Sequence, residues 1–239
     1  MPRLAKQPEP AADPGAEPPS PDAVGVVQVK VWLLGISPMV WRRLLVSDTC
    51  TLRELHGVIQ VAMGWEGIHL YQFCLRSRRF GSWEVSASSP DVTLARLKLR
   101  RGARFTYEYD LNIPWRHEVR IEENRLDAAP GKAYPTCAAG DGACPPEDCG
   151  GPRGYLAGLD RASSWDALED LHTMADILRK VVLEDRPELL KEQETRRRLE
   201  DAVERSKARE RARGLPFARR AVNAHLRKGE HLVLMHQQC

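Results

Sequence analysis

Three cysteines lie close together in the stretch YPTCAAGDGACPPEDCGGPRGY, and two histidines precede them in the chain. The cysteines have the spacing C-x6-C-x4-C, and the histidines fall on predicted strands. Thiolate and imidazole are the ligands that a tetrahedral Zn²⁺ site requires. We therefore predict a structural zinc site whose ligands are Cys137, Cys144, Cys149, His117 and His69. Neither cysteine pair has the compact C-x2-C spacing of a zinc knuckle, so a second interpretation stays open.

The second interpretation is a stiff connection between two elements of the fold. Pro145 and Pro146 restrict the backbone, while Gly150 and Gly151 permit positive φ angles. Tyr155 anchors the far end of the segment in the core, and reduced cysteines pack as small apolar side chains. This hypothesis explains every residue type in the segment except the cysteines.

A catalytic hypothesis uses the acids and histidines of the same region, namely Glu147, Asp148, Asp110, His117 and His69. Carboxylates beside an imidazole perform general acid–base catalysis, or hold a divalent cation for phosphoester hydrolysis. The competing interpretation is that adjacent acids in a loop are solvated or cap the next turn. On an alternating strand, His117 is also typical of a hydrogen-bonded core residue.

The C-terminal part of the chain carries a basic segment that could lie along nucleic-acid phosphates. Its candidate binding residues are Arg205, Lys207, Arg209, Arg211, Arg213, Arg219 and Arg220. Interleaved glutamates favour the alternative of a solvated helix face, and no aromatic platform or helix-turn-helix pattern accompanies the segment. Arg42 and Arg43 add basic positions on the preceding domain, either as a second patch or as ordinary surface.

Hydrophobic periodicity predicts the elements that position these residues. Residues 26–34 and 39–46 read as two strands joined by a turn, and 104–111 and 116–123 read as a hairpin. Residues 52–63 place apolar side chains at helical spacing, with threonine before them as a cap and Gly64 as the stop. A further strand is predicted near 69–81, and 128–155 is predicted to be loop throughout.

The last third of the chain is predicted to be helical. An apolar stripe begins at Trp165 and continues through Leu168, Leu171, Ala175, Leu178 and Val182. Residues 188–213 form a highly charged helix. We predict a disordered Pro/Ala-rich leader at 1–24, an α+β domain at 25–185 and a charged, basic helical tail at 186–239. The predicted fold class is α+β, with a mixed or antiparallel sheet and packed helices.

Length and composition limit the class of protein. The chain has 239 residues, 42% of them hydrophobic, and a formal net charge of +3, which is too small to imply a general attraction to nucleic acid or membrane. No apolar run is long enough to cross a bilayer, and the N-terminus lacks a signal-peptide core. We therefore expect a cytoplasmic protein without a membrane partner, in which the cysteines stay reduced.

Five blocks of sequence resemble the plasmid pRiA4b ORF-3-like family, in the expected order. They are ISPMVWRRLLV at 36–46, TLRELHGVIQVAMGW at 51–65, HLYQF at 69–73, FTYEYD…WRHEV at 105–119, and the cysteine-rich segment at 134–155. The resemblance implies an α+β fold without a settled activity. The family includes proteins labelled as passengers of insertion-sequence elements, and the basic tail is not part of the resemblance.

The chain departs from the family pattern at two places. The family reads close to YDFGDDWRHE, whereas this chain has YDLNIPWRHE, so Asn112-Ile113-Pro114 replaces the Gly-Asp-Asp core. The family also tends to carry His-x-His where this chain has His69-Leu70-Tyr71. If those acids and that histidine belong to a working site, this chain has lost or altered its activity.

The sequence therefore favours a binding or accessory module with an unknown protein or nucleic-acid partner. Two alternatives from other classes stay open. One is a nucleic-acid-binding accessory protein that uses the basic tail, and the other is a metal-dependent hydrolase. Whether the chain is an enzyme, and which ligand it takes, are not determined by these residues.

Overall fold

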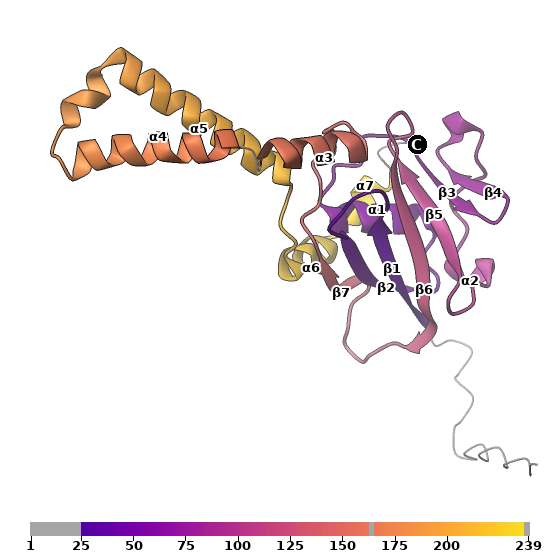
Figure 1. The fold of residues 1–239 in the computed structure, drawn as a ribbon. Coiled ribbons are helices and arrows are strands. Elements are labelled where there is room, and N and C mark those ends of the chain that lie inside the picture. Colours follow the sequence, from indigo (N-terminus) through magenta and orange to yellow (C-terminus); the bar gives the residue numbers. More distant parts are fainter. Residues whose placement is uncertain (1–24, 163–164, 237–239) are drawn as a thin grey trace, which may run out of the picture.

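The computed structural model describes residues 25–162 and 165–236, and the predicted leader at 1–24 lies outside the described residues. Within them, seven strands form one sheet in the order β4-β3-β5-β6-β1-β2-β7, with every neighbouring pair antiparallel (Figure 1). The strands are β1 (Gly25–Leu33), β2 (Trp41–Ser47), β3 (Tyr71–Leu75), β4 (Arg78–Gly81), β5 (Arg104–Tyr109), β6 (Trp115–Asp127) and β7 (Thr136–Asp141).

The two predicted hairpins form the centre of this sheet. β1 pairs with β2, and β5 pairs with β6 in a register that places Tyr107 opposite His117. Alternation along β1 buries Val29 and Val31 on one face and leaves Lys30 on the other. Strand and helix elements thus share one domain, and the predicted α+β class is confirmed.

One strand contradicts the prediction that 128–155 is loop throughout. β7 has the sequence TCAAGD and pairs with β2 at the edge of the sheet. The small residues of this segment show no strand pattern in the sequence. They form a strand because they pair with β2. Arg42, on β2, was also expected on the surface, but its side chain is buried.

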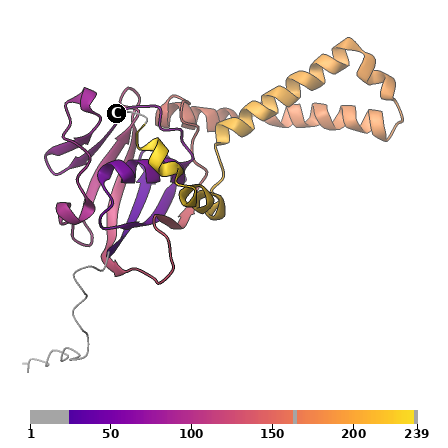
Figure 2. The same ribbon diagram turned by 180° about the vertical axis from the view of Figure 1, so that it is seen from behind.

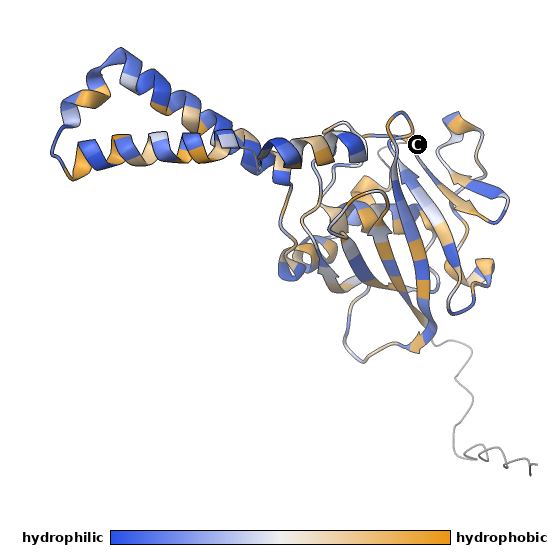
Figure 3. Ribbon diagram, viewed as in Figure 1, coloured by the Kyte–Doolittle hydropathy of each residue, from blue (hydrophilic) through white to orange (hydrophobic). Residues whose placement is uncertain are grey.

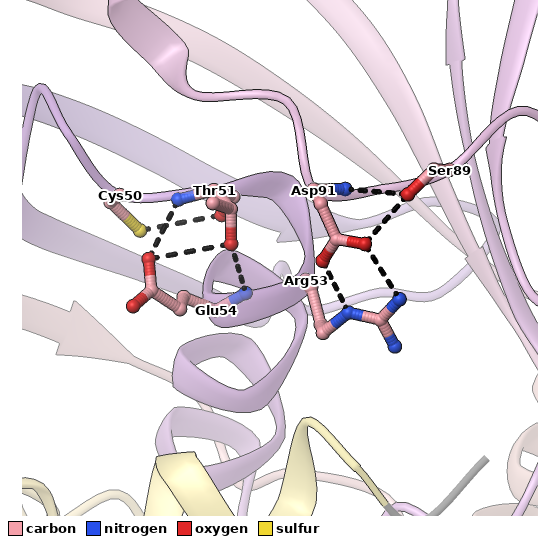
Figure 4. A network of polar contacts seen from close by, with 6 residues as sticks. All are labelled: Cys50, Thr51, Arg53, Glu54, Ser89 and Asp91. Atoms are coloured by element: carbon pink, nitrogen blue, oxygen red, sulfur yellow. Dashed lines mark hydrogen bonds and ion pairs between the residues drawn. The ribbon is translucent and has the colours of Figure 1, made fainter. Parts of the chain in front are cut away.

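Helix α1 (Leu52–Met63) packs across one face of the sheet and supplies much of the core. Its N-terminus carries a capping box, in which Thr51 accepts from the Glu54 backbone N–H and Glu54 accepts from the Thr51 backbone N–H (Figure 4). In the same view, Arg53 binds Asp91 with an Nε–Oδ1 distance of 2.6 Å. The hydrogen bonds from Arg53 and, to a smaller extent, from Ser89 lower the pKa of Asp91 to about 2. Gly64 ends the helix at a φ of 80°.

Two C-terminal helices return to the same face of the sheet. They are α6 (Arg219–Arg227) and α7 (Glu230–Leu234), and both contact α1 (Figure 2). Val222 and Leu226 belong to the hydrophobic core that α1 and the sheet form. The described part of the expected basic tail, residues 186–236, is therefore mainly helical, and α6 and α7 within it pack against the body.

Between the sheet and these last helices, the chain forms a long arm that projects from the body (Figure 1). The arm contains α3 (Gly151–Ala162), α4 (Trp165–Val182), the 3₁₀ turn η2 (Pro187–Lys191) and α5 (Gln193–Arg213). α4 and α5 run back along each other, and α3 packs against α5 near the body. The short elements η1 (Trp83–Val85) and α2 (Leu94–Leu97) complete the fold. None of the described helices is long and apolar enough to cross a membrane.

Candidate functional site

The segment CPPEDCGGPRGY lies at the junction between the sheet and the arm. It follows β7 and runs directly into α3, the first helix of the arm. The returning chain after α5 crosses it, because the backbone N–H groups of Cys144 and Leu215 each donate to the carbonyl of the other at 2.9 Å. The segment therefore holds both ends of the arm to the body.

Two buried indoles fix the backbone of this junction loop, residues 144–150. Trp65, just after α1, donates from Nε1 to the Pro145 carbonyl at 2.8 Å. Trp115, at the start of β6, donates from Nε1 to the Glu147 carbonyl at 3.1 Å. Both tryptophans are buried, and the hydrogen bond from Trp65 is itself buried and therefore shielded from water.

The two acids of the loop bind groups on the sheet and on the segment after α1. Glu147 accepts from the Tyr109 hydroxyl and from the Glu66 backbone N–H. Asp148 accepts from His69 Nε2 at 2.6 Å, and the His69 backbone N–H donates to the Tyr109 hydroxyl at 3.2 Å. Burial, followed by the bond to Glu147, raises the pKa of Tyr109, so its hydroxyl stays a donor at neutral pH.

Two of the three predicted cysteine ligands donate to backbone carbonyls close to them in the chain. Cys137, on β7, donates from Sγ to the Ala139 carbonyl, and Cys149 donates from Sγ to the Gly151 carbonyl. Cys144, which lies between these two residues in the sequence, is buried. Burial raises the pKa of Cys137 to about 11 and raises the pKa of Cys144 as well. These thiols are therefore protonated at neutral pH in the absence of a metal.

No group of three or more His, Cys, Asp or Glu side chains in the described part of the chain is arranged to hold a metal ion. His69 lies at the surface with Asp148, whereas His117 is fully buried in the core. The five predicted ligands are thus not gathered in one centre. Zinc binding stays a prediction, and the metal content of protein purified without chelator tests it.

The remaining members of the catalytic hypothesis support the backbone. Asp110 has a φ of 57°, and its Oδ1 accepts from the backbone N–H groups of Asn112 and Ile113 at 3.3 and 3.4 Å. It therefore shapes the β5–β6 turn, as an aspartate in a turn commonly does. His117 hydrogen-bonds through Nδ1 to the Trp115 carbonyl at 3.1 Å. Of the five proposed residues, His69 and Asp148 contact each other at the surface.

A buried polar cluster lies between α1 and the sheet, and the sequence analysis did not identify it. His56 Nδ1 and Gln60 Nε2 both lie 2.7 Å from the Tyr107 hydroxyl. The His56 ring stacks on Tyr71 with a centroid distance of 3.7 Å. In the described residues, His56 Nε2, Gln60 Oε1 and His117 Nε2 are buried without a hydrogen-bond partner. The signal for this cluster in the sequence is that two polar residues, His56 and Gln60, lie four positions apart within the apolar face of α1.

We expect the two buried histidines of this core to make the protein less stable in mild acid. Burial lowers the pKa of His56 and of His117 to about 3, below the value near 6.5 of an unfolded chain. Between pH 6.5 and about 3 the unfolded chain binds more protons than the folded one, so stability falls as the pH is lowered. The urea midpoint should therefore decrease from pH 7.5 to pH 4.5.

A substitution distinguishes the contribution of the buried histidines to this loss of stability from that of carboxylates, which also titrate in this pH range. In His117→Phe, the decrease in urea midpoint should be smaller, because one of the two buried groups no longer titrates. His225→Phe provides the control, since His225 is half exposed and bonds Glu230 at the surface. If the urea midpoint decreased equally in His117→Phe and in the parent chain, the acid sensitivity would not come from His117.

The segment that departs from the family pattern packs against the start of the arm. A Cβ on Gly151 would lie 2.6 Å from Ile113 Cγ2, so the glycine lets the two segments touch. Ile113 and Pro114 line a cleft of about 550 Å³ together with Gly150 and Pro152. Asn112-Ile113-Pro114 therefore forms an apolar contact with the arm at a position where acids occur in the family pattern.

Four of the predicted nucleic-acid-binding residues form ion pairs within the arm. Arg205 and Arg209 both bind Asp170 of α4, at 2.6 and 2.7 Å, and the Asp170 side chain is 5% exposed. Lys207 and Arg211 lie 3.4 and 3.6 Å from Glu204. The two pairs with Asp170 join α5 to α4, whereas the two pairs with Glu204 lie within α5.

The other three predicted residues lie where α5 ends and α6 begins. Arg219 donates from Nη1 to the Ala138 carbonyl on β7 at 3.1 Å. The Arg213 carbonyl accepts from the Tyr155 hydroxyl at 3.3 Å, and Arg220 is exposed at the start of α6. Arg219 therefore ties α6 to the sheet edge, and nucleic-acid binding stays a prediction.

Comparisons with known proteins find a relative in sequence, a solved structure and a family profile that match this chain. The chain is 40% identical over 136 residues to the uncharacterized protein y4hQ of Sinorhizobium fredii, a match that covers 54% of this chain and 69% of that protein. The crystal structure of MM3350, a protein of unknown function from Methanosarcina mazei Go1, matches with a TM-score of 0.56 and 31% identity, covering 60% of this chain and 84% of the other. The family profile for plasmid pRiA4b ORF-3-like protein matches residues 25–207. The chain therefore belongs to the plasmid pRiA4b ORF-3-like family.

Proposed function

We propose that this protein is a binding module in which the sheet domain carries a helical arm, and helix α4 of that arm binds a protein partner. One observation carries the proposal. Five large apolar side chains on α4 are each between 56% and 85% exposed: Trp165, Leu168, Leu171, Leu178 and Val182. A contiguous apolar stripe of this size on a folded protein marks an interaction surface.

The contrast between the two long helices of the arm supports this assignment. Figure 3 shows hydrophobic colour recurring along α4, whereas α5 is mostly hydrophilic. The outer side of α5 carries ion pairs such as Arg196–Glu200 and Arg197–Glu194, which suit a solvated surface. The apolar stripe therefore belongs to α4 in particular and does not reflect the composition of the arm.

The arm is also held rigidly enough to present this surface. Asp170 and Ile177, on a neighbouring side of α4, are buried, and Asp170 binds two arginines of α5. Near the body, the Tyr155 hydroxyl on α3 donates to the Arg213 carbonyl at the end of α5. A preorganised face loses less conformational entropy on binding than a flexible one.

Site-specific photo-cross-linking in cells that express the full chain tests the proposal. A benzophenone amino acid at Leu171 should give protein adducts, and the same group at Arg197 on the outer side of α5 should give none. The adducts at Leu171 should disappear when Leu178→Glu is added, because a charge in the stripe opposes apolar contact. Equal adduct formation at the two positions, or adducts that persist with Leu178→Glu, would contradict the proposal.

A further inference from the structure

The apolar stripe of α4 has the spacing of a coiled-coil seam. Leu168, Leu171, Ala175, Leu178 and Val182 follow one another at alternating intervals of three and four residues. This is the a/d pattern of a heptad repeat, with Leu171 and Leu178 at one of the two positions. Within the described residues, α5 packs on the neighbouring side of α4 that contains Asp170 and Ile177, and the seam itself is exposed.

We propose that the partner of this seam is a second copy of the chain, whose α4 packs antiparallel to the first about a two-fold axis near residue 173. This inference rests on the proposed function, because it names the occupant of the same face. A two-fold interface uses one surface twice, so the surface must be complementary to itself. The α4 seam meets that condition in the order of its side-chain sizes and in the pair of residues that flanks it. Its exposed apolar area is also large enough for a dimer interface.

The order of side-chain sizes along the seam fits an antiparallel pair. With the axis near residue 173, Leu171 faces Ala175 of the second copy, and Leu168 faces Leu178 of the second copy. The small alanine leaves room for the leucine opposite it, as knobs-into-holes packing requires. A parallel pair would instead place Ala175 against Ala175 of the second copy and leave a void at the centre of the interface.

One edge of the seam supplies a complementary pair of side chains. Trp165 and Arg179 are fourteen residues apart, so they occupy the same heptad position and flank the seam on the same side. The antiparallel arrangement brings Trp165 of one copy beside Arg179 of the other. Trp165 is 85% exposed, and the Arg179 side chain is 52% exposed, with its N–H groups bound to Asp176 and Glu184. The face of the guanidinium can therefore stack on the indole.

The area of the exposed patch matches half of a stable dimer interface. Leu183, 79% exposed, extends the stripe at the far end of α4. Taking about 200 Å² for each large apolar residue when fully exposed, the six side chains present roughly 800 Å² in one copy. A standard interface buries about 800 Å² per partner. Two α4 faces together would therefore form an interface of ordinary size.

The shape of the molecule also favours the antiparallel arrangement. α4 starts near the body and ends at the far tip of the arm (Figure 1). Antiparallel pairing places the two sheet domains at opposite ends of the interface, where neither obstructs the other. Parallel pairing would bring both bodies to the same end.

Sedimentation equilibrium of the full chain tests the stoichiometry. The parent chain should sediment with twice the chain mass of 27.0 kDa. The double variant Leu171→Glu, Leu178→Glu should sediment as a monomer with an unchanged circular dichroism spectrum, because both side chains are exposed in the single chain. Trp83→Glu is the matched control, since Trp83 is 73% exposed on the body, and this variant should remain a dimer. A parent chain that is monomeric up to about 100 μM overturns the inference, because an interface of standard size binds more tightly than that.

Disulfide trapping tests the orientation of the two helices. In the antiparallel pair, His172 lies next to the axis and beside His172 of the second copy, so His172→Cys should form an intermolecular disulfide. Val182→Cys should not, because its two copies lie at opposite ends of the interface. The parent chain under the same oxidation shows the background from its own cysteines. Cross-linking through Val182→Cys alone would establish a parallel pair and overturn the inference.

The mass of the photo-adduct at Leu171 separates this inference from the proposed function. An adduct of two chains supports both. An adduct with a different protein, together with a monomeric parent chain, retains α4 as a binding face but overturns the second copy as its occupant. The absence of any adduct overturns both.

Discussion

Arg42→Met is expected to lower the free energy of unfolding by about 3–5 kcal/mol, because the arginine donates to four backbone carbonyls inside the protein. Its guanidinium binds the carbonyls of Trp41, Ala62, Asp141 and Gly142 at distances of 2.8 to 3.2 Å. These carbonyls belong to β2, the end of α1 and the end of β7, so one side chain joins three elements. Methionine fills a similar volume without a donor, and the carbonyls would lose these hydrogen bonds.

The neighbouring arginine supplies the control for this prediction. Arg43 points to the other face of the sheet and forms a partly exposed ion pair with Glu122. Arg43→Met should cost less than about 1 kcal/mol, as exposed pairs commonly do. Urea unfolding of the two variants, followed by circular dichroism at one pH, provides the comparison. Similar losses would show that the bonds from Arg42 contribute little beyond those of a surface arginine.

The Arg42 substitution should also loosen the start of α6. Phe217 lies over the guanidinium with a distance of 4.3 Å from the charged carbon to the ring centroid. Phe217 precedes α6, which packs against α1 and β7. Backbone amides of α6 in Arg42→Met should therefore exchange with deuterium faster than in Arg43→Met. Protection that is equal in the two variants would mean that α6 is held by its other contacts.

Gly57→Ala is expected to destabilise the protein by about 2–3 kcal/mol, through overpacking between α1 and α7. A Cβ at Gly57 would overlap the backbone carbonyl oxygen of His231 and lie 3.2 Å from the Cβ of Met235. Because the obstacle is a backbone atom, it cannot be relieved by rotating a side chain. The two helices must separate, and α7 should lose its protection from hydrogen exchange.

A second helical glycine offers a matched control, in which alanine is expected to raise the stability of the protein. In Gly158→Ala on α3, the added Cβ would lie 3.5 Å from the Cβ of Ala212, which is an ordinary van der Waals contact. Alanine also restricts the unfolded chain, so this variant should be more stable by about 0.4–1 kcal/mol. Thermal or urea unfolding measures both variants. A gain of stability in Gly57→Ala would show that α7 does not pack as described.

The segment between α5 and α6 crosses Cys144 of the junction loop, and Phe217 covers Arg42 beside it. The junction loop, Arg42 and the segment between α5 and α6 therefore form one connected joint at the base of the arm. The dense prolines, glycines and acids of CPPEDCGGPRGY have a structural explanation in this joint. The hydrogen bonds from Trp65 and Trp115 to the loop support the same view.

Elements whose signals are local can be predicted from the amino-acid sequence without tertiary information. The capping threonine, the apolar positions of 52–63 and the glycine at 64 predict α1 because a helix buries one side at a period of 3.6 residues. Alternating side chains and short turns predict the β1–β2 and β5–β6 hairpins for the same kind of reason. The family resemblance in five blocks also follows from sequence alone, and it is confirmed by the matched residues 25–207. The match includes residues 186–207, so the expectation that the basic tail lies outside the resemblance is wrong for that part.

The environments of the charged and potentially reactive side chains depend on tertiary contacts. The sequence does not show that Arg42 is buried among carbonyls, that Arg205 neutralises Asp170, or that β7 completes the sheet edge, because each depends on partners distant in the chain. The same holds for α4, whose apolar stripe is visible in the sequence but is typical of a core helix. Its exposure follows from the position of α5, which covers the neighbouring side of the helix and leaves the seam to solvent.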